Sequence, residues 1–239
     1  MKQSILLACL LVAGFMSQAQ KFVINDRNAE IRSVSSFTGV KISSAIDLYL
    51  SQGDENAVAV SASDPGVRAR IKTEVKNGVL SIWFDSRGWG DWKGNKNMKA
   101  YVSVKTLESL KADGACDVNL MGKIRADKLS VDLDGASDIK GELDCNELNM
   151  DVSGASDTRL KGNIGTIAVK ISGASSIKGW DLVADFCAVD ASGASSMNVV
   201  VNKELKVKAS GASDINYRGN GVIREMRSSG ASSINRKDG

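Results

Sequence analysis

The stretch GASDIKG at residues 135–141 decides the fold, because it is one of seven closely related copies. The other copies read GACDVNL, GASDTRL, GASSIKG, GASSMNV, GASDINY and GASSIN, and the intervals between their glycines are 21, 19, 19, 20, 18 and 19 residues. The glycines are Gly114, Gly135, Gly154, Gly173, Gly193, Gly211 and Gly230. A catalytic motif usually occurs once, whereas a motif at nearly constant spacing is the signature of a repeat fold. We therefore interpret these glycines as a structural ladder.

The residues before each motif glycine alternate between apolar and polar side chains. Before Gly135, the apolar residues are Leu129, Val131 and Leu133, and the residues between them are polar. This period of two predicts a half-buried strand. A strand with a crossover helix needs ~30 residues, so the shorter unit fits one coil of a β-solenoid, with equivalent positions stacked ~4.8 Å apart. The sequence thus predicts an all-β, single-stranded parallel β-helix with about 19 residues per coil.

The repeat pattern extends toward the N-terminus, where it becomes irregular. Residues 40–48 align with the repeat and place Ser44 at the glycine position. We expect a turn at residues 64–66 and a hairpin at the Asn77-Gly78 pair, followed by a loop from residue 88 to residue 97. The expected organisation is one domain over residues 21–239, with decorated coils over 21–110 and regular repeats over 111–239.

The first twenty residues, MKQSILLACLLVAGFMSQAQ, have the pattern of a secretory signal peptide. Lys2 precedes an apolar run at residues 5–16, which is too short to span a bilayer, and a small-x-small stretch follows it. We expect cleavage after Ala19 or Gln20, although a lipoprotein cleavage box at residues 6–9 is left open. The mature chain is then exported to the periplasm, the outer-membrane surface or the medium, and it has no second apolar segment that predicts a membrane span.

Composition argues against several kinds of function. The formal net charge is +3 and falls to +2 when Lys2 is removed, which gives no electrostatic basis for nucleic-acid binding. The chain contains no histidine, so Ser-His-Asp and Cys-His nucleophile systems are excluded. Without histidine or paired CxxC spacing, neither a metal nor another cofactor is predicted.

Three cysteines remain after the expected cleavage, namely Cys116, Cys145 and Cys187. An odd number cannot form a complete disulfide framework in an exported protein. Cys116 replaces the motif serine and Cys187 falls at an apolar repeat position, so we expect small buried thiols. One disulfide among the three is left open.

Two groups of residues are candidates for chemistry. Asp117, Asp138 and Asp157 recur at one repeat position, and stacked carboxylates could support polysaccharide hydrolysis or cation binding. The alternative is an outward polar column whose charges are relieved by neighbouring lysine and arginine.

The second group is the loop SRGWGDWKGNKN at residues 86–97, where flat indole rings among glycines could stack on sugar faces or anchor a protein. Its contact candidates are Trp89, Trp92, Arg87 and Lys93.

The stretch SAIDLYLSQGD at residues 44–54, followed by serial GASD and GASS motifs, resembles one known family. This is the family called putative autotransporter adhesin, head GIN domain, formerly a domain of unknown function and common in Bacteroidetes. The resemblance covers residues 31–239. It implies a right-handed parallel β-helix and an adhesin-like role, and it provides no catalytic or binding residues to carry over.

These observations favour an exported, non-enzymatic binding module of the cell envelope, an adhesin that contacts a surface glycan or an envelope protein. Two alternatives stay open at this stage. One is a pectinase-like, carbohydrate-active β-helix enzyme that uses the stacked aspartates, and the other is a purely structural envelope protein.

Overall fold

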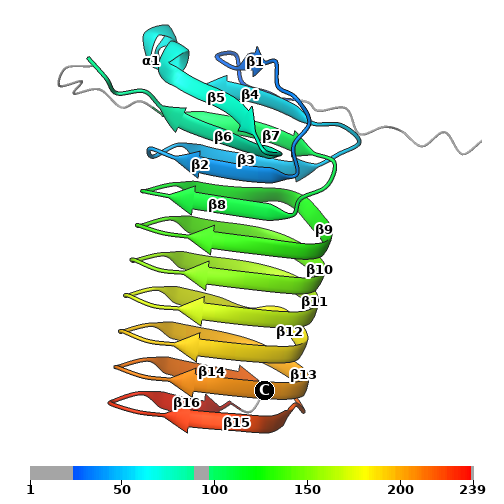
Figure 1. Cartoon of the computed structure of the whole chain (residues 1–239), viewed down its shortest axis with the longest axis vertical. Coiled ribbons are helices and arrows are strands. Elements are labelled where there is room, and N and C mark those ends of the chain that lie inside the picture. Colours follow the sequence, from blue (N-terminus) through cyan, green and yellow to red (C-terminus); the bar gives the residue numbers. More distant parts are fainter. Residues whose placement is uncertain (1–23, 89–96, 238–239) are drawn as a thin grey trace, which may run out of the picture.

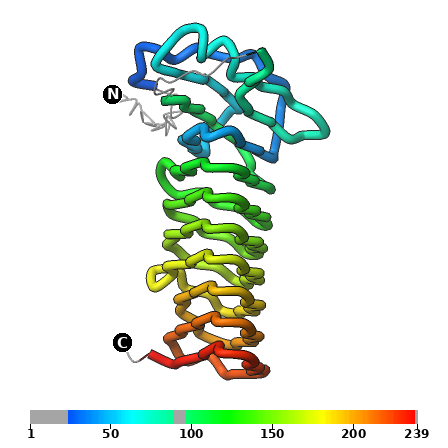
Figure 2. Tube along the Cα trace, turned by 90° about the vertical axis from the view of Figure 1, so that its left-hand side faces the viewer, coloured from blue at the N-terminus to red at the C-terminus, as the bar shows by residue number. Residues whose placement is uncertain are grey.

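The computed structural model describes residues 24–88 and 97–237 and consists of a tall stack of β-coils with a broader N-terminal end (Figures 1 and 2). Each complete coil of the regular array is one long strand that bends around the core. The strands of the array are β8 (Ser109–Asp113), β9 (Asp117–Leu133), β10 (Asp138–Val152), β11 (Asp157–Ile171), β12 (Ser176–Ala191), β13 (Ser196–Ala209), β14 (Asp214–Arg218), β15 (Val222–Ser228) and β16 (Ser233–Arg236). Within the described residues, no helix is long and apolar enough to cross a membrane.

Neighbouring coils pair in parallel, one repeat apart. Asp117 pairs with Asp138 across 21 residues, Asp157 with Ser176 across 19, and Ser196 with Asp214 across 18. These offsets match the intervals between the motif glycines. The predicted all-β parallel solenoid is therefore confirmed.

Inward-facing positions of successive coils stack into apolar columns. In one of them Leu129, Leu148, Ile167, Cys187 and Leu205 are all buried and follow one another in register. One contiguous apolar core runs through the stack. The alternation seen in the sequence exists because each strand has one face toward this core and one toward solvent.

The three cysteines are buried and unpaired, so none of them forms a disulfide. Burial raises the pKa of the Cys187 thiol to about 12. Burial also raises the pKa of Cys116 and of Cys145. These thiols therefore serve as small core residues, which is the role expected from their repeat positions.

The motif turn brings consecutive coils into backbone contact. Gly154 has a φ of 76°, and a Cβ added there would collide with the carbonyl oxygen of Gly135 in the preceding coil. The adjacent Ala155 N–H donates to that same oxygen at 2.7 Å. Glycine is required because it accepts the left-handed conformation and leaves room for this approach.

The motif serines form a buried hydrogen-bonded ladder. The Ser156 hydroxyl donates to the Ser153 carbonyl at 3.0 Å and accepts from the Ser137 N–H at 3.2 Å. Ser156 N–H in turn donates to the Ser175 hydroxyl of the next coil. Cys116 occupies the same column, and its thiol donates to the Asp113 carbonyl at 3.5 Å.

The N-terminal coils stack out of chain order. They consist of β2 (Gly39–Ser43), β3 (Asp47–Gln52), β6 (Val79–Phe84) and β7 (Lys99–Val104). The coil of β2 and β3 pairs in parallel with β6 and β7 on one side and with β8 and β9 on the other. The first coil in the sequence is thus sandwiched between the second and the third (Figure 1).

Antiparallel strands and one short helix lie beyond the coil of β6 and β7, at the end of the stack. These elements are β1 (Glu30–Arg32), β4 (Ala57–Ser61), α1 (Pro65–Arg70) and β5 (Ile71–Lys76). β4 pairs antiparallel with β7 and β5 with β6, so together they cover an edge that a parallel coil would leave open. The turn predicted at residues 64–66 is wrong: the Asp64 carboxylate accepts from the N–H groups of Gly66 and Val67 and begins α1, with proline in its first turn.

Candidate functional site

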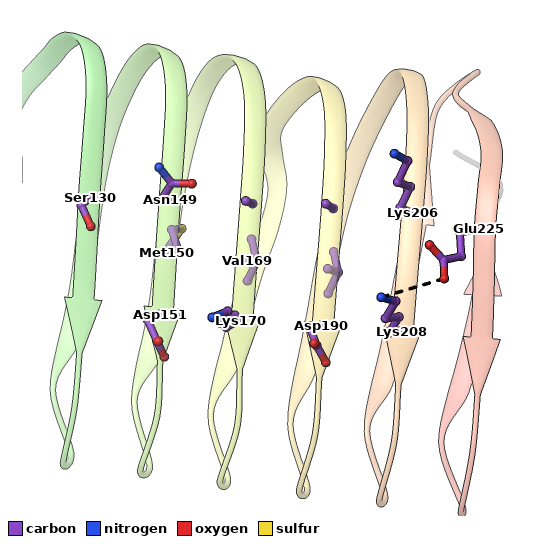
Figure 3. Close-up of a pocket in the computed structure, with 13 residues that line it drawn as sticks. Ser130, Asn149, Met150, Asp151, Val169, Lys170, Asp190, Lys206, Lys208 and Glu225 are labelled. Atoms are coloured by element: carbon purple, nitrogen blue, oxygen red, sulfur yellow. Dashed lines mark ion pairs between the residues drawn. The ribbon is translucent and has the colours of Figure 1, made fainter.

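A long hollow of about 470 Å³ lies on the outer surface of the sheet formed by β9 to β13 and β15 (Figure 3). It is lined by Ser130, Asn149, Met150, Asp151, Ala168, Val169, Lys170, Ala188, Val189, Asp190, Lys206, Lys208 and Glu225. We call it the axial hollow, because it crosses these strands in the direction of stacking.

The floor of the axial hollow is low because two adjacent coils carry alanine at an outward position. Ala168 pairs with Ala188, and their column continues to Asn149 on one side and to Lys206 on the other. The two methyl groups leave a depression between longer side chains. The next residues along the two strands, Val169 and Val189, are apolar and buried.

The rim of the axial hollow carries charges that alternate along the stack. Asp151, Lys170, Asp190 and Lys208 follow one another in register, about one strand spacing apart. Lys206 and Glu225 complete a set of three ammonium groups and three carboxylates among the lining residues, so the formal charge of the lining is zero.

Most polar groups around the axial hollow are unpaired. The ion pair in the rim is Lys208 with Glu225, at 3.9 Å (Figure 3). The side chains of Asn149, Asp151, Lys170, Asp190 and Lys206 have no hydrogen-bond or ion-pair partner among residues 24–88 and 97–237.

Carboxylates elsewhere on the same coils are largely engaged. Lys123 pairs with both Glu142 and Asp144, and Lys203 pairs with Asp185. A second hollow of about 430 Å³ contains Asp144 and Asp185, so its acidic groups are already satisfied. The contrast makes the axial hollow the better candidate for a ligand.

The aspartates singled out in the sequence lie in one column on another surface. Asp117 pairs with Asp138, and the Asp138 carboxylate accepts from the Asp157 N–H at 3.1 Å. Asp157 also forms ion pairs with Arg159 and Lys178. The column continues to Asp47, which sequence analysis did not include; burial, and then the nearby charge of Asp117, raise the pKa of Asp47.

Basic side chains neutralise this aspartate column at Asp157, whereas Asp117 and Asp138 form no ion pair among the described residues. Neither of the two hollows described above is lined by any of its members. Among the described residues, no group of three or more acidic or cysteine side chains could hold a metal ion.

The predicted tryptophan loop falls largely outside the described residues, since Trp89, Trp92 and Lys93 belong to residues 89–96. Arg87 is described: it is exposed and its guanidinium binds the Asp85 carboxylate at 2.8 Å. This contact holds the pKa of Asp85 well below its usual range. Three of the four contact candidates therefore lie outside the described residues, and this site stays a prediction.

The axial hollow was not predicted from the sequence. Its signal was alanine at two successive outward positions, Ala168 and Ala188, where the other coils carry longer polar side chains. Alanine is so common that this signal becomes visible only when the register places the two residues side by side.

Comparison with known families supplies the classification. The family described as putative auto-transporter adhesin, head GIN domain, matches residues 36–221. The chain belongs to this family. A comparison with curated proteins finds no match.

Solved structures with the same fold carry related names. A putative adhesin from Bacteroides fragilis is similar with a TM-score of 0.77 and 21% identity, over 87% of this chain and 96% of that one. A putative lipid binding protein from Parabacteroides distasonis has a TM-score of 0.67 and 19% identity, over 89% and 98% of the two chains. A putative adhesin from Parabacteroides merdae has a TM-score of 0.65 and 17% identity, over 88% and 95%. At these identities the likeness concerns the fold alone, and the head GIN assignment rests on the family match.

Proposed function

We propose that this head GIN protein is an exported, non-enzymatic binding module of the cell envelope, which contributes to adhesion by binding a glycan in the axial hollow. The observation that carries the proposal is the set of unpaired polar side chains around an apolar floor. Family membership supports a surface binding role at a coarser level. Export itself is inferred from the signal sequence and the family.

The chemistry of the hollow suits a sugar. A saccharide ring presents C–H groups on its faces and hydroxyls around its edge. The methyl groups of Ala168 and Ala188 would meet the ring face, while Asp190 would accept from hydroxyls and Lys170 would donate to them. Because the rim charges cancel, an uncharged ligand would meet no net repulsion.

The proposal is non-enzymatic because the carboxyls of the aspartate column flank neither of the two hollows. A glycosidase needs one carboxyl that is held protonated beside one that is ionised, and both must flank a bound substrate. Asp157 is instead held by two cations, and the column lies outside both hollows. A purely structural envelope role predicts instead that the parent protein binds no saccharide.

Filling the axial hollow is expected to abolish glycan binding. In a glycan-array screen of residues 21–239, the Ala188→Trp variant should lose the signal of the parent, because an indole would occupy the floor. Ala174→Trp is the matched control, since Ala174 is exposed in a motif turn outside the hollow. Circular dichroism melting confirms that each variant folds.

A lipid is the principal competing ligand. One structural neighbour is named a lipid binding protein, and the apolar floor could accept an acyl chain. Phosphatidylglycerol vesicles and free palmitate are therefore tested beside the array. Binding of either one by the parent, with no glycan bound, would contradict the glycan proposal.

The tryptophan loop is proposed as a second contact surface, involving Trp89, Trp92, Arg87 and Lys93. On the same array, the Trp89→Ala/Trp92→Ala double variant is expected to weaken binding by about tenfold, since burying two aromatic rings contributes of order 1–3 kcal/mol. Trp83→Phe in strand β6 serves as the control for loss of an indole away from the loop. Unchanged binding by the double variant would remove the loop from the site.

A further inference from the structure

The shape of the axial hollow restricts the kind of glycan that it can bind. Its lining residues come from six strands, β9, β10, β11, β12, β13 and β15. With strands ~4.8 Å apart, five steps give a length of about 24 Å along the stack. Across the stack the lining is short, because on β11 it extends only from Ala168 to Lys170.

Longer side chains flank the floor on both sides in the central coils. On β12, Ala188 lies between the outward positions of Phe186, which is 41% exposed, and Asp190. On β11, Ala168 lies between Thr166 and Lys170. The hollow is therefore a shallow channel along the stack that is bounded across it, and its floor is lowest at the two alanines and rises at Asn149 and at Lys206.

We propose that the ligand is a linear, unbranched and uncharged oligosaccharide that lies along the solenoid axis in the axial hollow. This inference rests on the proposed function and specifies its ligand class. A chain of several sugar rings fits the length of the channel, whereas a branch would meet Phe186 or the rim on either side. Successive rings then meet equivalent positions of successive coils.

Lys170 is the specificity-determining residue at the centre of the channel. It lies in register between Asp151 and Asp190, and all three side chains lack partners among the described residues. An ammonium with a carboxylate on either side presents donors between two sets of acceptors, which suits the alternating donor and acceptor character of sugar hydroxyls. A ligand that reaches this point gains three polar contacts together.

The alternation of rim charges argues against a uniformly charged polymer. A polymer of uronic acids would face a carboxylate at Asp151 and again at Asp190, and a polycation would face Lys170 and Lys208. Like charges at such spacing repel. An uncharged chain avoids both penalties.

The test is a length series measured by isothermal titration calorimetry on residues 21–239. The probes are linear β-1,4-linked oligomers of glucose and of N-acetylglucosamine, from two to six sugar units, beside galacturonic acid oligomers of equal length. We expect affinity for at least one neutral series to rise with each added unit until the channel is filled, and the uronic acid series to bind more weakly.

The variant Lys170→Met is expected to reduce affinity for the longest neutral oligomer by about tenfold, as loss of a charged hydrogen-bond donor would. Lys140→Met is the matched control, because Lys140 is an exposed lysine on a neighbouring coil outside the hollow. An equal effect of the two substitutions would overturn the role of Lys170.

The outcomes separate this inference from the proposed function. Saccharide binding with no dependence on length, or equally tight binding of uronic acid oligomers, would overturn the inference and leave glycan binding intact. If the parent binds no saccharide in the titrations or on the array, the proposed function is wrong and the inference falls with it.

Discussion

Replacing Gly154 with alanine is expected to lower the free energy of unfolding by on the order of 3–5 kcal/mol, in the range reserved for severe steric and backbone conflicts. Gly154 has a φ of 76°, a region that L-residues other than glycine enter at a cost of roughly 1–2 kcal/mol. The new Cβ would also collide with the Gly135 carbonyl oxygen, which accepts the Ala155 N–H. Relieving the collision requires separating two coils. Equilibrium urea denaturation followed by circular dichroism measures the change.

Gly78→Ala is the matched control for this prediction. Gly78 has nearly the same φ, 75°, but no heavy atom lies within 4 Å of a Cβ built there. Only the backbone penalty of roughly 1–2 kcal/mol is therefore expected. If the two substitutions destabilise the protein equally, the close contact between stacked motif glycines adds nothing to the cost of the backbone conformation.

Replacing Ser156 with alanine is expected to lower the free energy of unfolding by about 1–3 kcal/mol, the typical cost of leaving a buried polar group unsatisfied. The Ser156 hydroxyl accepts from the Ser137 N–H, and that N–H is buried in the ladder. Alanine cannot accept this hydrogen bond, and water has no access to replace it. The measurement is again urea denaturation.

The chain itself offers a conservative control for the serine ladder. Cys116 occupies the same column, and its thiol donates to Asp113 as Ser156 donates to Ser153. Ser156→Cys is therefore expected to cost less than Ser156→Ala, because sulfur retains a weak acceptor and donor. A cysteine variant as unstable as the alanine variant would contradict this expectation and would show that sulfur cannot replace the hydroxyl oxygen in a regular coil.

The regular coils could be predicted in detail because each depends on local information. Alternation in Leu129 to Leu133 marks the inward face, and the glycine spacing sets the register, so the parallel pairing follows. The hairpin at Asn77 and Gly78 was also predicted correctly, since both residues have positive φ and join antiparallel strands. At Asp64-Pro65, by contrast, the same residues can begin a turn or a helix, and α1 formed.

The candidate site was less predictable. Exposed tryptophans and stacked aspartates drew attention in the sequence because such residues are individually unusual. The axial hollow depends on two small residues, Ala168 and Ala188, that lie side by side, and on charged side chains that have no partner. Both features arise between residues that are about one repeat apart in the sequence. No single position reveals them.

The sequence by itself determined that this chain is a repeat protein of stacked β-coils, because the glycine, the buried serine and the apolar alternation recur at fixed intervals and each is required wherever one coil passes another. Only the tertiary structure decided the order of the first three coils. The pairing of β2 and β3 between β6 and β7 on one side and β8 and β9 on the other places the second coil outside the first. The physical reason is that the coils share equivalent backbone edges and apolar columns, so local sequence fixes the shape of each coil but not its neighbour. The same stacking decided which outward side chains meet, and hence where the surface is hollow and where its charges remain unpaired.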